Sequence, residues 1–292
     1  MEPLPSGVEV ELVPGENNLQ FSAHALPPAA DNLVIKAAHT TWNALGLPPT
    51  GWRVRITANI PMGSGLGSSA TAIVAGAVAA NALAGHVLST SELLHIAAGI
   101  EGHPDNVVPA LLGGYTVVVS DESASDTDDG DITGTRANLD STALTWQRFA
   151  VDHVEVVVAI PDMTISTARA RQALPQSVPH ADAVFNVGRA SLLTAAMAAA
   201  NTSALAAALA DKLHEPYRKA LVPGFDDVVR AARLRGALGA ALSGAGPTVV
   251  AFIPKGANAE AVGAAMVAAF DDAGVSARWL ALKPDNAGTV IE

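Results

Sequence analysis

The sequence predicts an α+β protein with two domains. Residues 8–13 and 52–60 alternate apolar and polar side chains, which is typical of strands with one face toward solvent. Alanine-rich runs indicate closely packed helices. Beyond residue 150 the predicted order is strand, helices, two strands, helix and strand, which is the split ferredoxin-like arrangement. We therefore predict domains at residues 1–150 and 151–292.

Turn-forming and helix-capping residues mark the ends of the predicted helices and strands in the first half of the chain. Pro14 and Gly15 end the first strand, and Asp31 is the expected N-cap of a helix that runs to about Leu45. A second helix begins after the loop at 61–67 and stops at Gly85. The remaining expected elements are a helix at about 91–100 capped by Ser89 or Ser91, a turn at 101–106 containing Pro104, a strand at 115–120, and an acidic solvated loop at 121–131.

The second half begins with a predicted strand at 154–160, and short helices are expected between residues 167 and 235. Residues 237–242 and 248–253 form a predicted hairpin around Gly244, Ala245 and Gly246. A helix at about 257–273 and a strand at 277–282 complete the predicted domain.

Composition limits the classes of function. The chain of 292 residues can bury a sizeable core, and its 50% hydrophobic content excludes a largely disordered protein. Without Cys there are no disulfides or thiolate metal sites, and residues 1–10 lack the basic start of a secretory signal, so a cytoplasmic enzyme is expected. The net charge of −11 argues against a nucleic acid partner, because phosphate contacts need clustered Lys and Arg.

Two uncharged stretches, residues 56–91 and 190–210, are long enough to cross a membrane. The first contains closely spaced glycines, a proline and Asn81, and the second contains three consecutive polar residues from Asn201 to Ser203. Alanine also contributes little drive into lipid. We therefore expect packed helices here and no membrane partner.

The segment Pro61–Ala70, with the sequence PMGSGLGSSA, organises the chemistry of the chain. It follows the predicted strand at 52–60 and precedes an apolar helix. Glycine lets the backbone approach a ligand closely, and the first amides of a helix have no partner within the helix. Ser68, Ser69 and Thr71 add hydroxyls at the start of that helix. This order of strand, glycine loop and helix predicts a phosphate site.

Two common phosphate loops do not match this segment. A Walker A loop requires Gly-Lys-Ser/Thr, and no Lys lies between Lys36 and Lys212. A Rossmann loop has the spacing G-x-G-x-x-G after a fully buried strand, whereas Gly63, Gly65 and Gly67 have the spacing G-x-G-x-G after an alternating strand. Because no Lys accompanies the loop, a divalent cation must neutralise much of the phosphate charge, and Mg²⁺ suits that role.

Three motifs occur in order along the chain: PMGSGLGSSA at 61–70, EGHPDNVVPALLGG at 101–114 and SGAGPT at 243–248. They resemble the P-x-x-x-G-L-G-S-S-A, E-G-H-P-D-N-V-x-P-A-L-L-G-G and S-G-A-G-P-T motifs of the homoserine kinases, in the GHMP small-molecule kinase family. The resemblance runs from about Asn32 to the last strand. It implies a GHMP kinase fold, with an N-terminal ribosomal-protein-S5-domain-2-like domain and a C-terminal ferredoxin-like α/β-sandwich domain.

The resemblance implies ATP as co-substrate, Mg²⁺ as cofactor and L-homoserine as the small-molecule substrate, phosphorylated on its side-chain hydroxyl in threonine biosynthesis. Ser69 (or Ser68) and Glu101 are the expected metal ligands, since Mg²⁺ prefers oxygen. The implied ATP contacts are Asn32, Pro61, Met62, Gly63, Ser64, Gly65, Leu66, Gly67, Ser68, Ser69, Gly244 and Gly246.

Asp105 is the expected catalytic residue that orients the substrate hydroxyl, because phosphoryl transfer depends mostly on positioning and electrostatic stabilisation. The resemblance adds His103 and Asn106 as substrate contacts. It also implies that Arg171, in a segment similar to S-T-x-x-A-R-x-x-L-P, is catalytic and binds the substrate carboxylate together with Arg218, in a segment similar to H-x-P-Y-R. The ordinary alternatives are a turn-capping Asp, a structural His and surface arginines.

The N-terminus departs from the family. Homoserine kinases begin with a strand and the motif P-A-x-x-A-N-L-G-x-G-F-D, which supplies an Asn and an Asp to the substrate pocket, and nothing in residues 1–26 replaces it. The N-terminal domain is therefore expected to be truncated, and an exposed sheet edge would favour pairing with a second copy in a homodimer. Two rival interpretations stay open: a kinase for another small alcohol such as mevalonate, and a catalytically impaired nucleotide-binding remnant.

Overall fold

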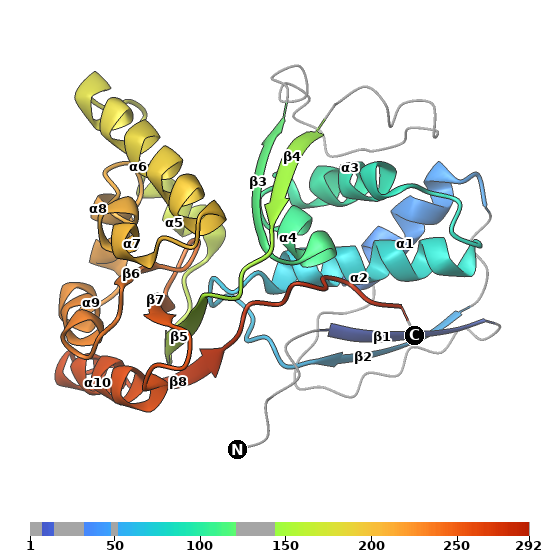
Figure 1. Ribbon diagram of the computed structural model, residues 1–292. Helices are drawn as coiled ribbons and strands as arrows, with labels where there is room; N and C mark the ends of the chain where they lie inside the picture. The colour runs from blue at the N-terminus through green and yellow to red at the C-terminus, as the bar shows by residue number, and fades with distance from the viewer. Residues whose placement is uncertain (1–7, 15–31, 48–51, 121–143, 292) are drawn as a thin grey trace. The chain divides into compact units, whose positions relative to one another are not determined.

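The computed structural model describes residues 8–14, 32–47, 52–120 and 144–291 (Figure 1). The chain forms two compact units. The first comprises residues 1–60, 67–148 and 287–292, and the second comprises residues 61–66 and 149–286. The glycine loop therefore belongs to the second unit, although the strand before it and the helix after it belong to the first.

The described part of the first unit contains two small sheets and four helices. Strand β1 pairs antiparallel with β2, with Val8 opposite Ala58 and Pro14 opposite Trp52, and β3 pairs with β4. The strands are β1 (Val8–Pro14), β2 (Trp52–Ala58), β3 (Tyr115–Ser120) and β4 (Leu144–Phe149), and the helices are α1 (Leu33–Ala44), α2 (Ser68–Leu83), α3 (Thr90–Glu101) and α4 (Val107–Leu112). Neither β4 nor α4 was predicted, and the predicted acidic loop lies outside the described residues.

Side-chain caps fix where two of these helices begin. Asn32 caps α1, since its Oδ1 accepts a hydrogen bond from the Val34 amide at 3.0 Å, and the prediction of Asp31 as N-cap was therefore wrong. Ser89 caps α3 and forms a capping box with Glu92, which confirms one of the two predicted caps. Helix α3 extends to Glu101, so this residue ends a helix and does not lie in the following turn.

Helices α1 and α2 pack closely because Gly76 presents no side chain. A Cβ atom at Gly76 would lie 2.1 Å from the backbone oxygen of Val34 in α1. Buried alanines line the same region, and the Trp42 indole donates a hydrogen bond to the Ala80 carbonyl at 3.1 Å. The alanine-rich run is thus a closely packed helix, as predicted.

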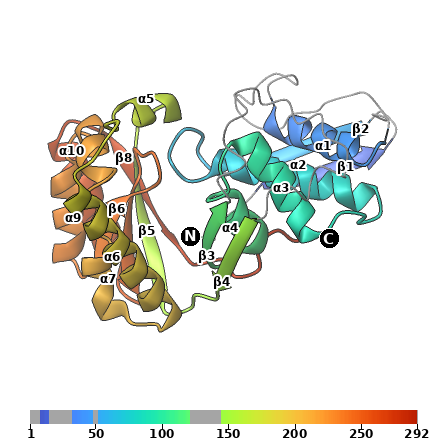
Figure 2. The same ribbon diagram turned by 90° about the horizontal axis from the view of Figure 1, so that it is seen from above.

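The second unit contains a four-stranded antiparallel sheet in the order β6-β7-β5-β8. This order is that of a ferredoxin-like fold, so the predicted arrangement is confirmed. Helices α9 and α10 cover one face of the sheet (Figure 2). The strands are β5 (Val154–Pro161), β6 (Gly239–Leu242), β7 (Val249–Pro254) and β8 (Ala277–Leu282). The helices are α5 (Thr167–Gln172), α6 (His180–Ala198), α7 (Leu205–Ala208), α8 (Glu215–Arg218), α9 (Phe225–Leu234) and α10 (Ala259–Asp272), with 3-10 turns η4 (Thr202–Ala204) and η5 (Lys219–Leu221).

The helices of the second unit differ from the prediction in one respect. Helix α6 has 19 residues, whereas only short helices were expected between residues 167 and 235. Within the described ranges, none of the helices combines the length and the apolarity that a membrane span requires.

The contact at Gly76 generates a stability prediction. We expect Gly76→Ala to lower the free energy of unfolding by about 1–3 kcal/mol, because the added methyl group meets backbone that cannot move aside cheaply. Gly188, in α6, is the matched control, since a Cβ there meets nothing within 4 Å. Gly188→Ala should raise the free energy of unfolding by up to about 1 kcal/mol. Denaturant titrations measure both, and equal effects would contradict this account of the helix contact.

Candidate active site

The glycine loop is held by the turn between β6 and β7. The Ser243 hydroxyl donates to the Gly65 carbonyl at 2.8 Å, and the Thr248 amide donates to the Ser64 carbonyl at 3.3 Å. A Cβ atom at Gly65 would lie 2.2 Å from the Ser243 carbonyl oxygen and 3.0 Å from that of Gly246. The loop and the SGAGPT turn are therefore in backbone contact, and only glycine permits that contact at position 65.

The loop backbone adopts the conformation for which glycine is needed. Gly63, Gly65 and Gly67 have φ angles of 65°, 80° and 75°, in the left-handed region. The Ser64 side chain is buried within the loop, and its hydroxyl donates to the Pro61 carbonyl at 2.7 Å. The loop thus offers its backbone amides, and not the Ser64 hydroxyl, to a ligand.

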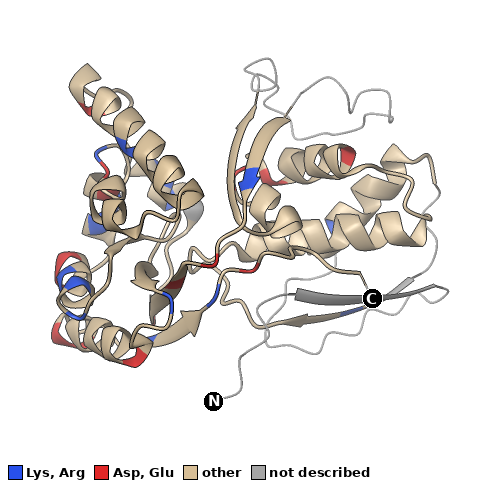
Figure 3. Ribbon diagram, viewed as in Figure 1, with Lys and Arg blue, Asp and Glu red and all other residues tan. Residues whose placement is uncertain are grey.

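The start of α2 is suited to an anion. Gly67 is the N-cap and has no side chain that could bind the first amides of the helix. The Thr71 hydroxyl donates back to the Gly67 carbonyl at 2.9 Å, so its proton is directed at the backbone of the loop. Neither the loop nor α2 contains a charged residue (Figure 3). The positive end of the helix dipole is therefore the local source of positive potential within these two segments.

Ser69 and Glu101 come together in the first unit. The Ser69 hydroxyl donates a hydrogen bond to the Glu101 Oε2 atom, and both residues are half-buried. Ser69 is thus the serine that reaches the carboxylate. Among the described residues, no three His, Asp or Glu side chains gather into a metal site. A hydroxyl and a carboxylate oxygen fit the preference of Mg²⁺, which usually keeps several waters and phosphate oxygens beside one or two protein ligands.

The turn after α3 places three predicted residues together. The His103 Nδ1 atom lies 2.5 Å from the Asp105 Oδ1 atom, and the Asn106 amide group lies 3.5 Å from the same oxygen. The Asp105 side chain is 71% exposed. Asn106 is the N-cap of α4 and makes no side-chain capping bond. The carboxylate of Asp105 is therefore held by neighbouring side chains and remains accessible to a ligand.

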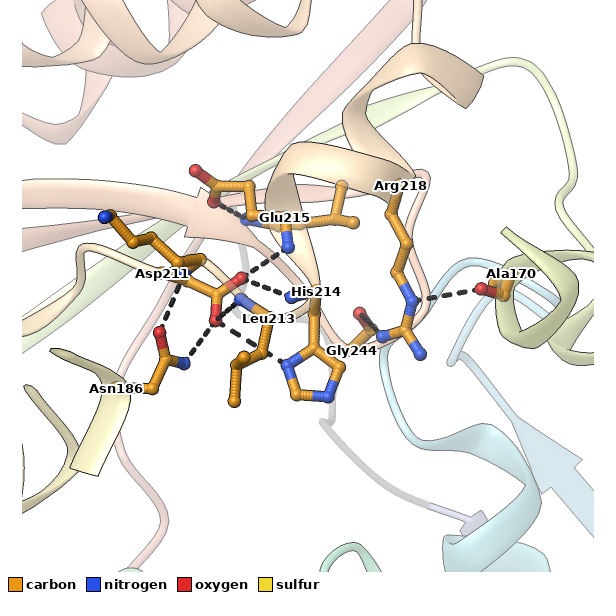
Figure 4. A network of polar contacts seen from close by, with 10 residues as sticks. Ala170, Asn186, Asp211, Leu213, His214, Glu215, Arg218 and Gly244 are labelled. Atoms are coloured by element: carbon orange, nitrogen blue, oxygen red, sulfur yellow. Dashed lines mark hydrogen bonds and ion pairs between the residues drawn. The ribbon is translucent and has the colours of Figure 1, made fainter. Parts of the chain in front are cut away.

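Arg218, on α8, connects two of the motif segments (Figure 4). Its Nε donates to the Ala170 carbonyl in α5, and its Nη1 donates to the Gly244 carbonyl, both at 3.3 Å. Burial is the main cause that lowers the pKa of Arg218; the charge of Asp211 raises the pKa and the charge of Arg171 lowers it. The two predicted arginines are thus close enough for their charges to repel, and an anion that binds both would relieve that repulsion.

Asp211 organises the start of α8 (Figure 4). Its carboxylate accepts hydrogen bonds from the Asn186 side chain at 2.6 Å and from the amides of Leu213 at 3.1 Å, His214 at 2.7 Å and Glu215. Burial alone would raise the pKa of Asp211, but these hydrogen bonds outweigh it and lower the pKa from 3.8 to about 2. The carboxylate is therefore ionised at neutral pH and stabilises this turn.

Asp211, Asn186 and Glu215 were not predicted as site residues from the sequence. The Glu215 carboxylate accepts a hydrogen bond from the Leu242 amide at 3.3 Å, and burial raises the pKa of Glu215. One local signal was available for Asp211. An acidic residue shortly before a helix with Pro in its first turn is typical of a cap, and Pro216 is in the first turn of α8. No local signal joins Asp211 to Asn186, which is 25 residues away.

The contact at Gly65 generates a second stability prediction. Ala at either Gly65 or Gly67 must adopt a left-handed backbone, which costs about 1–2 kcal/mol. A Cβ at Gly65 also meets the Ser243 backbone, whereas one at Gly67 meets nothing within 4 Å. We expect Gly65→Ala to lower the free energy of unfolding by about 1–3 kcal/mol more than Gly67→Ala does. Denaturant titration of the two variants decides this, and equal losses would mean that the loop is not held against the turn.

Comparisons with known proteins agree with this geometry. Residues 32–114 match the family model for the GHMP kinases N terminal domain, and residues 193–272 match that for GHMP kinases C terminal. A homoserine kinase from Parasynechococcus marenigrum is 42% identical over 259 residues, which cover 89% of this chain and 76% of that protein. A homoserine kinase from Carboxydothermus hydrogenoformans is 40% identical over 287 residues, which cover 97% and 87% of the two chains.

A solved structure extends the match to three dimensions. The crystal structure of homoserine kinase from Cytophaga hutchinsonii is 28% identical in sequence, with a TM-score of 0.80, over 97% of this chain and 88% of that chain. The family models, the sequence relatives and this structure agree with one another. The chain therefore belongs to the GHMP kinase family, and within it to the homoserine kinases.

Proposed function

We propose that this chain transfers the γ-phosphoryl group of ATP to the side-chain hydroxyl of L-homoserine, giving O-phospho-L-homoserine for threonine biosynthesis. The observation that carries the proposal is the glycine loop at 63–67, fixed by the SGAGPT turn ahead of a helix start without a side-chain cap. The substrate is suggested by the names of relatives that are 40% and 42% identical.

The backbone amides of residues 63–69 would bind the phosphates of ATP, with Gly244 and Gly246 beside the loop. The loop and α2 lack Lys and Arg. Without a cation, amide dipoles alone would therefore have to balance the phosphate charge. Ser69 and Glu101 would hold a Mg²⁺ ion bound with the nucleotide, and this ion supplies the missing positive charge. Both protein ligands are oxygen atoms, which suits Mg²⁺.

Asp105 would orient the substrate hydroxyl by accepting its hydrogen bond, while His103 and Asn106 hold the carboxylate in place. In the transfer step the hydroxyl oxygen would form the new bond to the γ-phosphorus, and its proton would pass to the Asp105 carboxylate that accepts its hydrogen bond. The bond from phosphorus to the ADP oxygen breaks, and ADP leaves. Phosphoryl transfer depends on positioning and on charge stabilisation, so this arrangement needs no covalent intermediate on the protein.

Arg171 and Arg218 would bind the carboxylate of homoserine, whose negative charge offsets the repulsion between them. Mevalonate also carries a carboxylate, so these arginines do not distinguish the two substrates. The contact of Asn32 with adenine stays a prediction; this residue is only 3% exposed, and its Oδ1 caps α1. The homodimer also stays a prediction.

The experiment that tests the function measures ADP release by the purified chain with ATP and Mg²⁺. Homoserine, threonine, serine and mevalonate are offered in turn. We expect kcat/KM for homoserine to exceed that for each of the others by at least about 100-fold, because a substrate of the wrong shape leaves polar groups of the site unpaired. Turnover that prefers mevalonate, or binding of ATP without any turnover, would overturn the proposal.

Asp105→Asn is the matched variant in the same assay, because it keeps the shape of the side chain and removes its charge. We expect kcat with homoserine to fall by at least about 100-fold, since the amide orients the hydroxyl poorly. The Kd for ATP, measured by calorimetry, should not change. If the variant weakens ATP binding as much as it slows turnover, Asp105 does not act on the substrate hydroxyl.

A further inference from the structure

Helix α8 is too short to hold its own conformation. It has four residues, Glu215–Arg218, and the first turn of a helix is costly to form in isolation. Arg218 is its last residue, so the direction of the guanidinium depends on whatever fixes this turn. At the start of the turn, the carboxylate of Asp211 accepts hydrogen bonds from three backbone amides, and the Glu215 carboxylate also accepts one from the Leu242 amide.

Asp211 fixes the turn through backbone atoms, and α6 in turn fixes Asp211. The carboxylate is 20% exposed and accepts from three successive amides, those of residues 213–215. Asn186 of α6 donates its amide group to Asp211 Oδ1 and accepts the Lys212 amide at 2.9 Å through its own carbonyl. The cap of α8 is therefore held by a side chain of α6, a helix of 19 residues.

The other end of α8 reaches the glycine loop in two steps. Arg218 donates to the Gly244 carbonyl, and the neighbouring Ser243 donates to the Gly65 carbonyl. All of these residues belong to the second unit. The direction of Arg218 is thus linked on one side to Asp211 and on the other to the turn that holds the loop.

We propose that Asp211 is a positioning residue for substrate recognition, whose carboxylate fixes α8 so that Arg218 faces the carboxylate of the substrate. This inference rests on the proposed function, because it takes Arg218 as a receptor for the homoserine carboxylate. Asp211 itself acts through the backbone of residues 213–215 and through Arg218.

The four hydrogen bonds require a carboxylate and not an amide. A carboxylate has two acceptor oxygens, whereas Asn has one and would direct its own NH₂ group at other donors. Whichever way the amide of an Asn at 211 is turned, at least one backbone amide loses its partner. Asp211→Asn is therefore nearly isosteric and yet disrupts the cap.

The experiment compares Asp211→Asn with Asp182→Asn in the complete chain. Asp182, in α6, is 25% exposed and pairs with the Nζ atom of Lys212, the residue after Asp211, at 2.8 Å. Its variant therefore removes a carboxylate of similar burial and makes no described contact with the α8 backbone. We expect Asp211→Asn to raise KM for homoserine at least about 10-fold with KM for ATP unchanged. Asp182→Asn should leave both values unchanged. Equal effects of the two variants on KM for homoserine would overturn the inference.

A double-mutant cycle separates positioning from general loss of stability. In a chain that already carries Arg218→Gln, Asp211→Asn should raise KM for homoserine by less than about twofold, because the residue through which it acts is gone. A residue that only stabilises the fold would lower the melting temperature and the active fraction without this dependence. Full additivity of the two KM effects would overturn the inference.

Hydrogen exchange keeps this inference distinct from the proposed function. Without any substrate, the amides of residues 213–215, 217 and 218 should exchange at least about 10-fold faster in Asp211→Asn than in the wild-type chain or in Asp182→Asn. If wild-type protein does not turn over homoserine, the proposed function fails, and this measurement still reports whether Asp211 fixes α8. Unchanged exchange at these amides would overturn the inference whatever the activity.

Discussion

The approach of Gly65 to the backbone of Ser243 is the contact on which the candidate site depends. These residues are 178 positions apart, and a hydroxyl-to-carbonyl hydrogen bond and van der Waals contact hold their backbones together. The loop would bind phosphate through its backbone amides. The conformation of its backbone therefore determines whether these amides can bind phosphate. A loop with three left-handed glycines would be flexible alone, and the turn restricts it at Ser64 and Gly65. The Gly244 carbonyl of the same turn accepts a hydrogen bond from Arg218, so the proposed recognition of the substrate by Arg218 would be linked to the loop.

Electrostatics explains how an acidic chain can handle ATP. The net charge is −11, and the loop and α2 carry no charged side chain (Figure 3). Amide dipoles and the start of α2 provide part of the attraction for phosphate. The Ser69–Glu101 pair would give a cation two oxygen ligands, and the cation would reverse the local sign of the potential. Arg171 and Arg218 are the proposed receptors for the substrate carboxylate, and the charge of Arg171 lowers the pKa of Arg218.

Local patterns predicted more of the fold than of the site. Alternation and glycine punctuation predicted the ferredoxin-like order of the second sheet and the course of α2, because these features repeat along short segments. The six-residue α4 and the strand β4 gave too little periodicity to predict. Asp31 was predicted to cap α1, whereas the N-cap is Asn32. Asp and Asn both favour the N-cap position, so the sequence does not distinguish them. The Asp211–Asn186 pair was missed because tertiary packing alone brings it together.

The most direct test of the account follows the backbone amides of the loop as a nucleotide binds. Amide NMR resonances of Gly63, Gly65, Gly67, Ser68 and Ser69 would be recorded while a non-hydrolysable ATP analogue is added with Mg²⁺. The account predicts the largest saturable shifts at these amides, with none at Gly188, which is exposed on α6. Binding of the analogue that leaves the loop amides unmoved would contradict it.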